Sequence, residues 1–509
     1  MRKIFIIVIT LLLMTIGYGQ IPQSEYNMPI VVNNCAEHIP LDISVTAGDA
    51  NESQSPEHRY RRIYFVHGLG GDASAMEQMA NAFEYKNLNI KDFPARKCMT
   101  SRPEYKNSTG SLISAANDVK NQVRTQANAD LSLYNMRPED AFLIGHSQGG
   151  MVLRTMAHLD LVTSKEPMPS FGKGYNGIVT LGSPLQGAQI LNNKQMIINM
   201  CDHAARCLIA GPTSATMANL VLKKTFGREY REDMSALVAN TLLPAVFGDY
   251  FDGITNYYQV GASWINELNS DDSCIAYRNM PKVAFYGVEP QDRIFWRTAN
   301  WLVKNPNSVA PFEANDDRIF YHTIYAQVYM EYFSKYYYHK KRLHPKRTEA
   351  WKKGLDWFNT VDYQWQAIIG ARKYNLWYEC KCPITKIGKP KIYVYYFNAS
   401  DCLDDKCIDA LPVIRLGVSA TVKENDGVVL AESAANLPGH TNPPVRVFYR
   451  EEEYGNYNPQ TLIPFFPPGT NFVDYGTSHM QMRNDGGVKE KMFKLLNGEY
   501  GNFFRTLPK

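Results

Sequence analysis

The first part of the chain alternates short apolar runs with longer amphipathic segments. The runs Ile63–Val66, Ala141–Ile144 and Gly177–Leu181 have the composition of buried strands, and helices are predicted between them around Ala75–Phe83 and Ala115–Ala129. Alternating strands and helices are typical of a mainly parallel sheet with helices on both faces. The sequence therefore predicts an α/β protein whose functional groups lie at the carboxyl edge of the sheet.

Two long segments interrupt this alternation. The first is helix-rich and the second is rich in aromatic and basic residues, and the 509 residues exceed one ordinary domain. A cap that opens and a rigid cap are both compatible with the first segment. The predicted organisation is a first part of the core over residues 20–187, a helical cap or lid over 188–275, a core strand over 276–292, an aromatic-rich insertion with a cysteine cluster over 293–415 and a last part of the core over 416–509.

The segment Gly145–Gly150 reads Gly-His-Ser-Gln-Gly-Gly and follows an apolar run. A Gly-x-Ser-x-Gly sequence between a strand and a helix is typical of a nucleophile elbow, in which the serine occupies a tight, strained turn. The positions two before and two after that serine must lack a side chain, and Gly145 and Gly149 satisfy this requirement. Residues 151–159 are predicted to form the following helix, whose dipole favours negative charge beside the serine. We therefore predict that Ser147 is a catalytic nucleophile.

A nucleophilic serine also needs donors for the oxyanion that forms during acyl transfer. The first predicted strand runs directly into the loop His67–Gly71, and an apolar strand that breaks into His-Gly-x-Gly is typical of the loop that supplies one donor. Glycines in this loop let the backbone approach the substrate closely. We predict that the two donors are the backbone N–H groups of Leu69 and of Gln148, the residue after the nucleophile.

The general base should be a histidine late in the chain, because hydrolases with such an elbow place the serine first, the acid second and the histidine third. Two histidines lie beyond residue 344. His440 lies in a proline-rich loop, whereas His479 precedes a helix-like stretch from Val488 to Leu496. We predict that His479 is the base, with His440 as the alternative.

The acid that orients the base is predicted from a turn sequence. Asp426 lies in Asn-Asp-Gly, where it can accept the imidazole N–H and stay ionised. Most Asp-Gly pairs are simply turns. Glu289 and Asp292 are the alternatives, because they follow the strand-like run 283–288, after which such an acid often comes.

These segments together resemble the secreted bacterial triacylglycerol lipases of the α/β-hydrolase superfamily. The resemblance implies an α/β-hydrolase fold in which the aspartate of Asn-Asp-Gly is the triad acid and the histidine follows it, although the gap between the two is longer here. The family sometimes carries a structural calcium, but no dense carboxylate loop favours one in this sequence, and the chemistry needs no cofactor. The resemblance covers roughly residues 60–290 and 416–500 and rests on the motifs at 67–71, 145–150, 180–187 (Thr-Leu-Gly-Ser-Pro-Leu-Gln-Gly), 425–429 and 478–480 (Ser-His-Met).

The N-terminal residues and the net charge indicate where the protein acts and which partners are disfavoured. A basic start, the apolar run Ile4–Ile16 and small residues up to Gly19 have the organisation of a signal peptide over residues 1–19, and the run is shorter than the about 20 residues that span a bilayer. We therefore expect a secreted or periplasmic protein, with an uncleaved N-terminal anchor as the alternative. The net charge of +4 is modest for this length and argues against a nucleic-acid partner.

The second insertion contains two features with two interpretations each. The basic cluster His339–Arg347 is typical of a solvated helix end, and the second interpretation is attraction to anionic lipid. Five tyrosines from Tyr321 to Tyr336 recur at intervals of three or four and line one face of a predicted helix. Such a stripe is usually buried packing, and a substrate wall or a lipid-interface contact is the alternative.

The nine cysteines of an exported chain are expected to be mostly oxidised. Cys201 and Cys207 are close enough to close a small loop. Four more surround the strand-like run Lys391–Tyr396 and are predicted to form two bridges, although zinc binding by these four is the alternative. The odd count leaves at least one free thiol or an intermolecular bridge. The clustered four are Cys380, Cys382, Cys402 and Cys407.

The predicted function is cleavage of carboxylic esters, and of lipid esters by resemblance, through Ser147, His479 and Asp426. An amidase, an acyltransferase or an esterase of polymers would use the same triad. A non-catalytic binding protein on a hydrolase fold is the third interpretation, and the presence of all three candidates in the expected order argues against it. The expected partner is a lipid or other ester substrate, without a cofactor or metal, and the sequence does not specify the oligomeric state.

Overall fold

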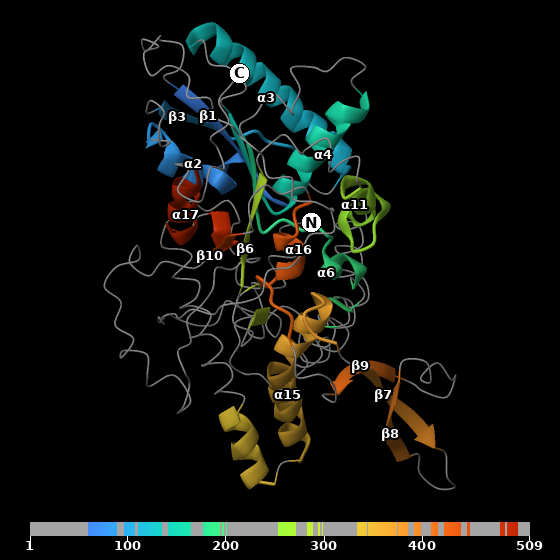
Figure 1. Cartoon of the computed structure of the whole chain (residues 1–509). Helices are drawn as coiled ribbons and strands as arrows, with labels where there is room; N and C mark the ends of the chain where they lie inside the picture. Colours follow the sequence, from blue (N-terminus) through green and yellow to red (C-terminus); the bar gives the residue numbers. More distant parts are fainter. Residues whose placement is uncertain are drawn as a thin grey trace, which may run out of the picture.

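The computed structural model describes the segments that carry most of these motifs (Figure 1). The predicted signal peptide, residues 1–19, lies outside them, as do residues 201–250 and 448–478. The described residues are 60–88, 96–106, 110–134, 141–163, 177–193, 196–197, 200, 253–270, 282–288, 294–295, 298, 333–343, 345–373, 375–384, 391–398, 409–415, 422–438, 445–447, 479–483 and 486–496.

A seven-stranded sheet lies at the centre of the fold, in the order β10-β6-β5-β4-β1-β3-β2. All neighbouring strands are parallel except β2, which pairs antiparallel with β3. This confirms the prediction of a mainly parallel sheet. The strands are β1 (Tyr60–Val66), β2 (Asn87–Leu88), β3 (Arg96–Ser101), β4 (Phe142–His146), β5 (Gly177–Leu181), β6 (Lys282–Gly287) and β10 (Val445–Val447).

Helices cover both faces of the sheet because its central strands carry apolar side chains on both sides. In β1, Tyr64 and Val66 belong to one buried cluster, whereas Ile63 and Phe65 belong to another. Successive side chains of a strand point to opposite faces, so a wholly apolar strand must be covered twice. The first cluster includes α3 (Leu112–Tyr134) and α4 (Gln148–Thr163), and the second includes α2 (Glu77–Phe83), the short turn η2 (Ala73–Met76) and α17 (Gly486–Leu496) (Figure 1).

Helix α3 is longer at both ends than the predicted 115–129. Leu112 is buried in the core at its start. Near its other end, Asp130 accepts hydrogen bonds from Nε and Nη2 of Arg62 in β1, at 2.8 and 2.5 Å. Both side chains of this ion pair are buried, so the pair fixes the last turns of α3 on the sheet.

The end of the predicted cap packs on α4. Helical residues 253–258 and α11 (Ser263–Leu268) lie beside it, and Nη2 of Arg154 donates 2.7 Å to the carbonyl oxygen of Leu268. His158 and Glu267 add a contact of 2.9 Å. Residues 253–268 of the predicted cap are therefore attached firmly to the core. The described start of the same segment 188–275 contains α6 (Gln189–Asn192).

The second insertion contains a long helix and a separate small sheet. Residues 333–341 are helical and lead to α15 (Pro345–Ile368). The small antiparallel sheet has the order β8-β7-β9, and β8 contains the strand predicted at 391–396 (Figure 1). Of the five predicted stripe tyrosines, only Tyr336 lies within the described residues. The strands are β7 (Asn375–Ile384), β8 (Lys391–Asn398) and β9 (Asp409–Arg415).

Cys98 is the one cysteine whose side chain the structure describes, and it is free and buried. Burial raises the pKa of its thiol to about 12. The predicted bridges of the other cysteines lie outside the described side chains and stay predictions. Among the described helices, none combines the length and apolar character needed to cross a membrane.

Candidate active site

Ser147 lies in a sharp turn between β4 and α4. Its φ is 53°, in the left-handed region that residues other than glycine rarely occupy, and its N–H donates 2.8 Å to the carbonyl oxygen of Leu181 in β5. A Cβ on Gly145 would lie 2.5 Å from the backbone of Gly149, and a Cβ on Gly149 would lie 2.4 Å from the carbonyl oxygen of Val66. Close backbone packing therefore requires both glycines, and the turn has the geometry of a nucleophile elbow.

His479 connects Ser147 to Asp426. Its Nε2 lies 2.8 Å from Oγ of Ser147, and its Nδ1 lies 2.8 Å from Oδ2 of Asp426. Because the carboxylate only accepts, Nδ1 carries the proton and Nε2 accepts the hydrogen of the serine hydroxyl. Asp426 is 1 % exposed and His479 is 4 % exposed, so the bond between them is shielded from water, whereas Ser147 is half-buried. The structure brings together the three residues that the sequence predicted, from segments far apart in the chain.

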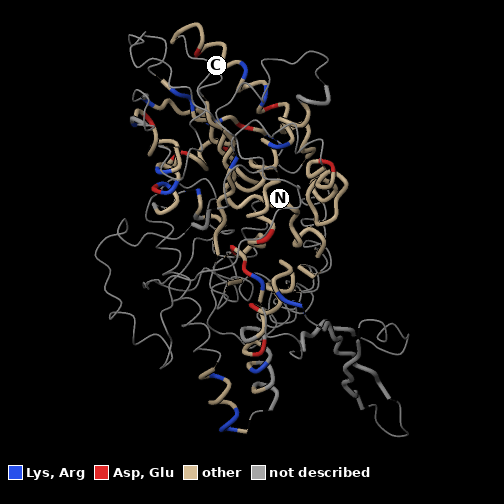
Figure 2. Tube along the Cα trace, viewed as in Figure 1, with Lys and Arg blue, Asp and Glu red and all other residues tan. Residues whose placement is uncertain are grey.

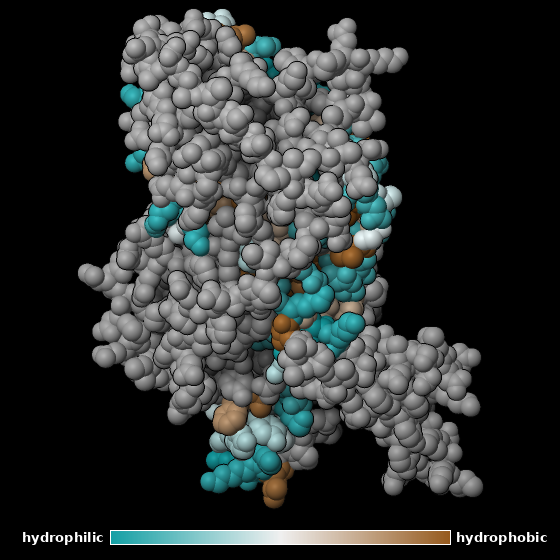
Figure 3. Space-filling model, viewed as in Figure 1, coloured by the Kyte–Doolittle hydropathy of each residue, from teal (hydrophilic) through white to brown (hydrophobic). Residues whose placement is uncertain are grey.

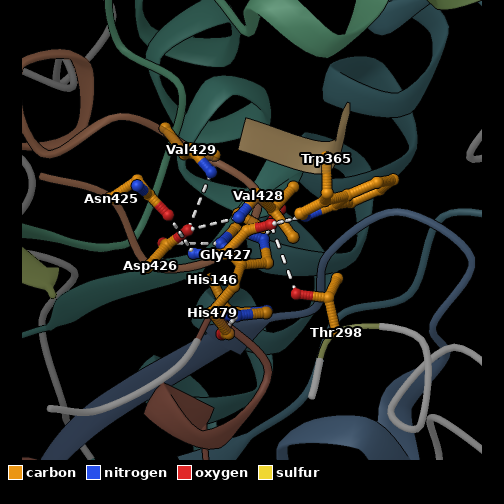
Figure 4. A network of polar contacts seen from close by, with 10 residues as sticks. His146, Thr298, Trp365, Asn425, Asp426, Gly427, Val428, Val429 and His479 are labelled. Atoms are coloured by element: carbon orange, nitrogen blue, oxygen red, sulfur yellow. Dashed lines mark hydrogen bonds and ion pairs between the residues drawn. The ribbon is translucent and has the colours of Figure 1, made fainter. Parts of the chain in front are cut away.

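The turn around Asp426 holds its carboxylate toward the histidine (Figure 4). Oδ1 accepts hydrogen bonds from the N–H groups of Val428 and Val429, at 3.0 and 2.7 Å, which leaves Oδ2 for His479. The side chain of Asn425 accepts a further hydrogen bond of 3.0 Å from the N–H of Gly427. The hydrogen bonds of this turn therefore fix the direction of the Asp426 carboxylate.

Gly427 also connects this turn to the second insertion. Its φ is 95°, and a Cβ here would lie 2.7 Å from Oγ1 of Thr298. Its carbonyl oxygen accepts a hydrogen bond of 2.8 Å from Nε1 of Trp365, in α15, and one of 3.3 Å from Thr298 (Figure 4). Nothing in the sequence pattern singled out Trp365 or Thr298.

The loop His67–Gly71 lies against the nucleophile. A Cβ on Gly68 would lie 2.9 Å from Cβ of Ser147. Gln148 is the first residue of α4, where backbone N–H groups donate outside the helix. The two predicted donor residues, Leu69 and Gln148, thus belong to the two segments that adjoin Ser147.

Tyr105, which the sequence did not single out, links these two segments. Its hydroxyl lies 2.8 Å from the carbonyl oxygen of His67 and 3.1 Å from Oε1 of Gln148. Its ring stacks on the imidazole of His67 with a centroid distance of 4.2 Å. The buried tyrosine therefore fixes the predicted oxyanion loop relative to the start of α4.

His146, directly before the nucleophile, ties the strand to the loop of the base. Its Nε2 lies 2.7 Å from the carbonyl oxygen of His479, so this nitrogen carries a proton and donates (Figure 4). Burial, with a smaller contribution from neighbouring His479, holds the pKa of His146 well below its usual value. A neutral imidazole therefore supports the backbone of the base.

The alternative residues His440, Glu289 and Asp292 lie outside the described residues. Within the described ranges, no group of three or more His, Cys, Asp or Glu side chains is arranged to hold a metal ion.

Residues 59–225 match the family described as the PGAP1-like alpha/beta domain. The match includes β1, the predicted oxyanion loop and Ser147 but less than half of the chain. No curated protein matches the chain. The sheet order, the elbow after β4 and this match define the chain as an α/β-hydrolase in fold.

Several solved structures are similar to the chain at low identity. The lipase BlEst2 of Bacillus licheniformis is 14% identical over 56% of this chain and 95% of its own, with a TM-score of 0.27. An extracellular α/β-hydrolase of a Paenibacillus species is 16% identical over 44% of this chain and 77% of its own, with a TM-score of 0.21. The phospholipase PlaB of Legionella pneumophila is 14% identical over 46% of this chain and 38% of its own, with a TM-score of 0.25. This likeness concerns the fold alone.

Proposed function

We propose that the protein is a serine hydrolase that cleaves carboxylic esters. The observation that carries this proposal is the pair of 2.8 Å contacts that join Asp426 to His479 and His479 to Ser147. A strained serine, an imidazole directed at its hydroxyl and a buried carboxylate behind the imidazole are the groups that acyl transfer through a covalent intermediate requires. A purely structural serine would not need a φ of 53°.

In the proposed mechanism, Nε2 of His479 takes the hydroxyl proton of Ser147 as Oγ attacks the ester carbonyl carbon. His479 then gives this proton to the leaving oxygen, which departs as the alcohol and leaves an acyl-enzyme. Water attacks the acyl carbon, and His479 takes one of its protons and returns it to Oγ as the carboxylic acid leaves. Asp426 stays ionised and stabilises the imidazolium that forms in each half of the reaction.

The oxyanion of each tetrahedral intermediate is proposed to accept hydrogen bonds from the N–H groups of Leu69 and Gln148. The closeness of Gly68 to Ser147 and the position of Gln148 at the start of α4 support this assignment. Removal of one such donor typically costs about 100- to 1,000-fold in kcat. The hydroxyl of Tyr105, which contacts both segments, would keep the two donors in register.

We propose acyl esters of lipids as the substrates and a secreted or periplasmic location for the protein. The support is the sequence: the lipase-like motifs, the apolar insertions and the signal-like residues 1–19. Each methylene of an acyl chain that enters an apolar groove contributes up to about 0.8 kcal/mol, or about fourfold in kcat/KM. A long groove should therefore produce a steep dependence on chain length.

The test is hydrolysis of p-nitrophenyl esters from acetyl to long-chain acyl groups, beside the matching p-nitroanilides. We expect ester hydrolysis that rises with chain length and is lost in a Ser147→Ala variant of unchanged circular dichroism. Activity that survives in this variant would show that Ser147 is not the nucleophile. Cleavage of anilides in preference to esters would identify an amidase, and a preference for acetyl would replace the lipid substrate with a small or polymer-bound ester.

A further inference from the structure

A short basic segment lies at the N-terminal end of α15, far from the proposed active site. Residues 333–343, here called the basic tip, form a helix and the turn that leads into α15. The tip contains no Asp or Glu, and all of its Lys and Arg side chains are exposed. Figure 2 shows Lys and Arg at this end of the molecule. Its cations are Lys335, Lys340, Lys341 and Arg342.

The same segment exposes large apolar side chains. Tyr337 is 50 % exposed, Tyr338 is 48 % exposed and Leu343 is 87 % exposed, the largest value among the exposed large apolar residues of the described chain. Figure 3 shows hydrophobic and hydrophilic surface side by side at this end. The end of α3 also exposes apolar residues, Leu131 and Leu133, but no cation lies in the stretch from Gln126 to Tyr134. Apolar and basic groups thus coincide at the basic tip.

The backbone of Leu343 adopts a strained conformation. Its φ is 51°, a left-handed conformation at the end of a helix, where glycine is the usual residue. A leucine in this place is strained and leaves its side chain in water. Strain at an exposed apolar residue indicates a function outside the folding of the chain itself.

Two of the cations of the tip lie over its aromatic rings. Nζ of Lys340 is 5.5 Å from the ring centre of Tyr336, and the guanidinium of Arg342 is 4.5 Å from the ring centre of Tyr338. Amphipathic rings with adjacent basic groups are typical of protein segments at a membrane–water interface. Because cations cover these ring faces, the rings are poorly placed to stack on nucleic-acid bases.

We propose that the basic tip binds the surface of an anionic lipid membrane. The lysines and the arginine would lie among negatively charged headgroups, while Leu343 and the tyrosines would enter the boundary with the acyl chains. The charge of the tip matches this partner, and the membrane would bury the strained leucine. The proposal does not depend on the proposed hydrolase activity.

The geometry assigns the tip an anchoring role. Twenty residues of α15 separate Pro345, next to the tip, from Trp365, which contacts the turn of Asp426, and this span is about 30 Å long. The tip therefore does not deliver substrate into the site. It would instead hold the protein at a lipid surface through a rigid helix.

The experiment is co-sedimentation of the purified full-length protein with vesicles. One set contains phosphatidylcholine alone and the other contains phosphatidylcholine with phosphatidylserine as roughly a third of the lipid. All variants share the apolar N-terminal segment, so binding to phosphatidylcholine alone reports its contribution. The parent protein should bind the anionic vesicles more tightly, and the difference should shrink as salt rises.

Two changes test the tip. Lys340→Gln, Lys341→Gln and Arg342→Gln together should weaken the anionic binding on the order of a hundredfold, at about fivefold for each cation. Leu343→Gly should weaken it about tenfold, the loss of one leucine from the interface. This glycine relieves the left-handed strain, so unfolding by urea should show unchanged or higher stability. Weaker membrane binding with undiminished stability cannot come from damage to the fold.

The matched controls lie on other surfaces. Leu133→Ser removes an exposed leucine from α3, and Lys106→Gln, Lys120→Gln and Arg124→Gln together make the same change in net charge. Both controls should bind like the parent, and so should Ser147→Ala, whatever its activity. Equal binding by the parent and the tip variants would overturn the proposal. Binding of a single-stranded oligonucleotide that needs the cations but not Leu343, without binding to vesicles, would instead identify a nucleic-acid surface.

Discussion

The indole N–H of Trp365 donates a hydrogen bond of 2.8 Å to the carbonyl oxygen of Gly427. Trp365 belongs to the second insertion, whereas Gly427 directly follows the proposed triad acid. The two residues are 62 positions apart in the sequence, and the indole is buried. Helix α15 of the insertion is therefore part of the support for the acid turn.

Replacement of Trp365 with phenylalanine should lower kcat. The change keeps an aromatic ring in the core but leaves the carbonyl of Gly427 without its shorter hydrogen bond, at a cost of about 1–3 kcal/mol. If part of this cost, about 1.4 kcal/mol, appears as misplacement of Asp426 in the transition state, kcat falls about tenfold. Steady-state kinetics on the best ester should show this loss with little change in KM.

Trp264 provides the control for this substitution. Its Nε1 donates 3.1 Å to Oγ1 of Thr155, on the side of α4 where the cap packs, and its ring contacts His158 and Tyr257. Trp264→Phe should lower stability to a similar degree and leave kcat nearly unchanged. Equal losses of kcat in both variants would show that Trp365 acts through general stability and does not position the acid.

Asp426→Asn should preserve the turn and still lower kcat by about 10⁴-fold, because the amide favours the wrong tautomer of His479 and removes its countercharge. The N–H groups of Val428 and Val429 can still donate to the amide oxygen. Glu289→Gln and Asp292→Asn should have small effects. The reverse ranking would move the acid to the segment after β6.

His479→Ala should lower kcat by several orders of magnitude with a small effect on folding, because the imidazole transfers protons and its backbone contacts remain. His440→Ala, the comparison, should be mild. Single-turnover measurement of acyl-enzyme formation separates the loss of chemistry from a loss of product release. An inactive His440→Ala variant with an active His479→Ala variant would exchange the two assignments.

The sequence predicts the central sheet and the elbow well because their signals are local. An apolar strand, a Gly-x-Ser-x-Gly turn and an apolar helix are contiguous in the chain, and close packing requires the glycines at 145 and 149. The same holds for the Asn-Asp-Gly turn, whose hydrogen bonds join residues two or three positions apart. The residues of such a turn determine its conformation by themselves, so the sequence alone predicts it.

The supports of the site have no local signal. Tyr105 and Trp365 contact the site through single polar atoms, 43 and 62 residues from their partners Gln148 and Gly427. A lone tyrosine or tryptophan in an amphipathic segment reads as ordinary packing, and only the tertiary fold directs its polar atom. His146 lies inside the elbow motif, yet its bond to the backbone of His479 spans 333 residues. Prediction from sequence therefore finds the three residues of the proposed triad and misses these distant side chains that hold them in place.

The stability of the protein should fall as the pH drops below about 6.5, the ordinary pKa of histidine. Burial lowers the pKa of His146 and of His67 in the folded state, so between the folded and unfolded pKa values the unfolded chain binds more protons. The free energy of unfolding therefore rises with pH in this window, by up to about 1.4 kcal/mol per pH unit for each histidine, and the contribution is complete above it.

Urea unfolding of the parent and of His146→Gln at pH 7.5, 6.5 and 5.5, pH values chosen around the ordinary pKa of about 6.5, measures the slope of this free energy against pH. The glutamine can still donate to the carbonyl of His479 but does not titrate. The free energy of unfolding of the variant should therefore change less steeply with pH than that of the parent, by the contribution of about one proton. Identical slopes would show that His146 is not the neutral buried group inferred from its contacts.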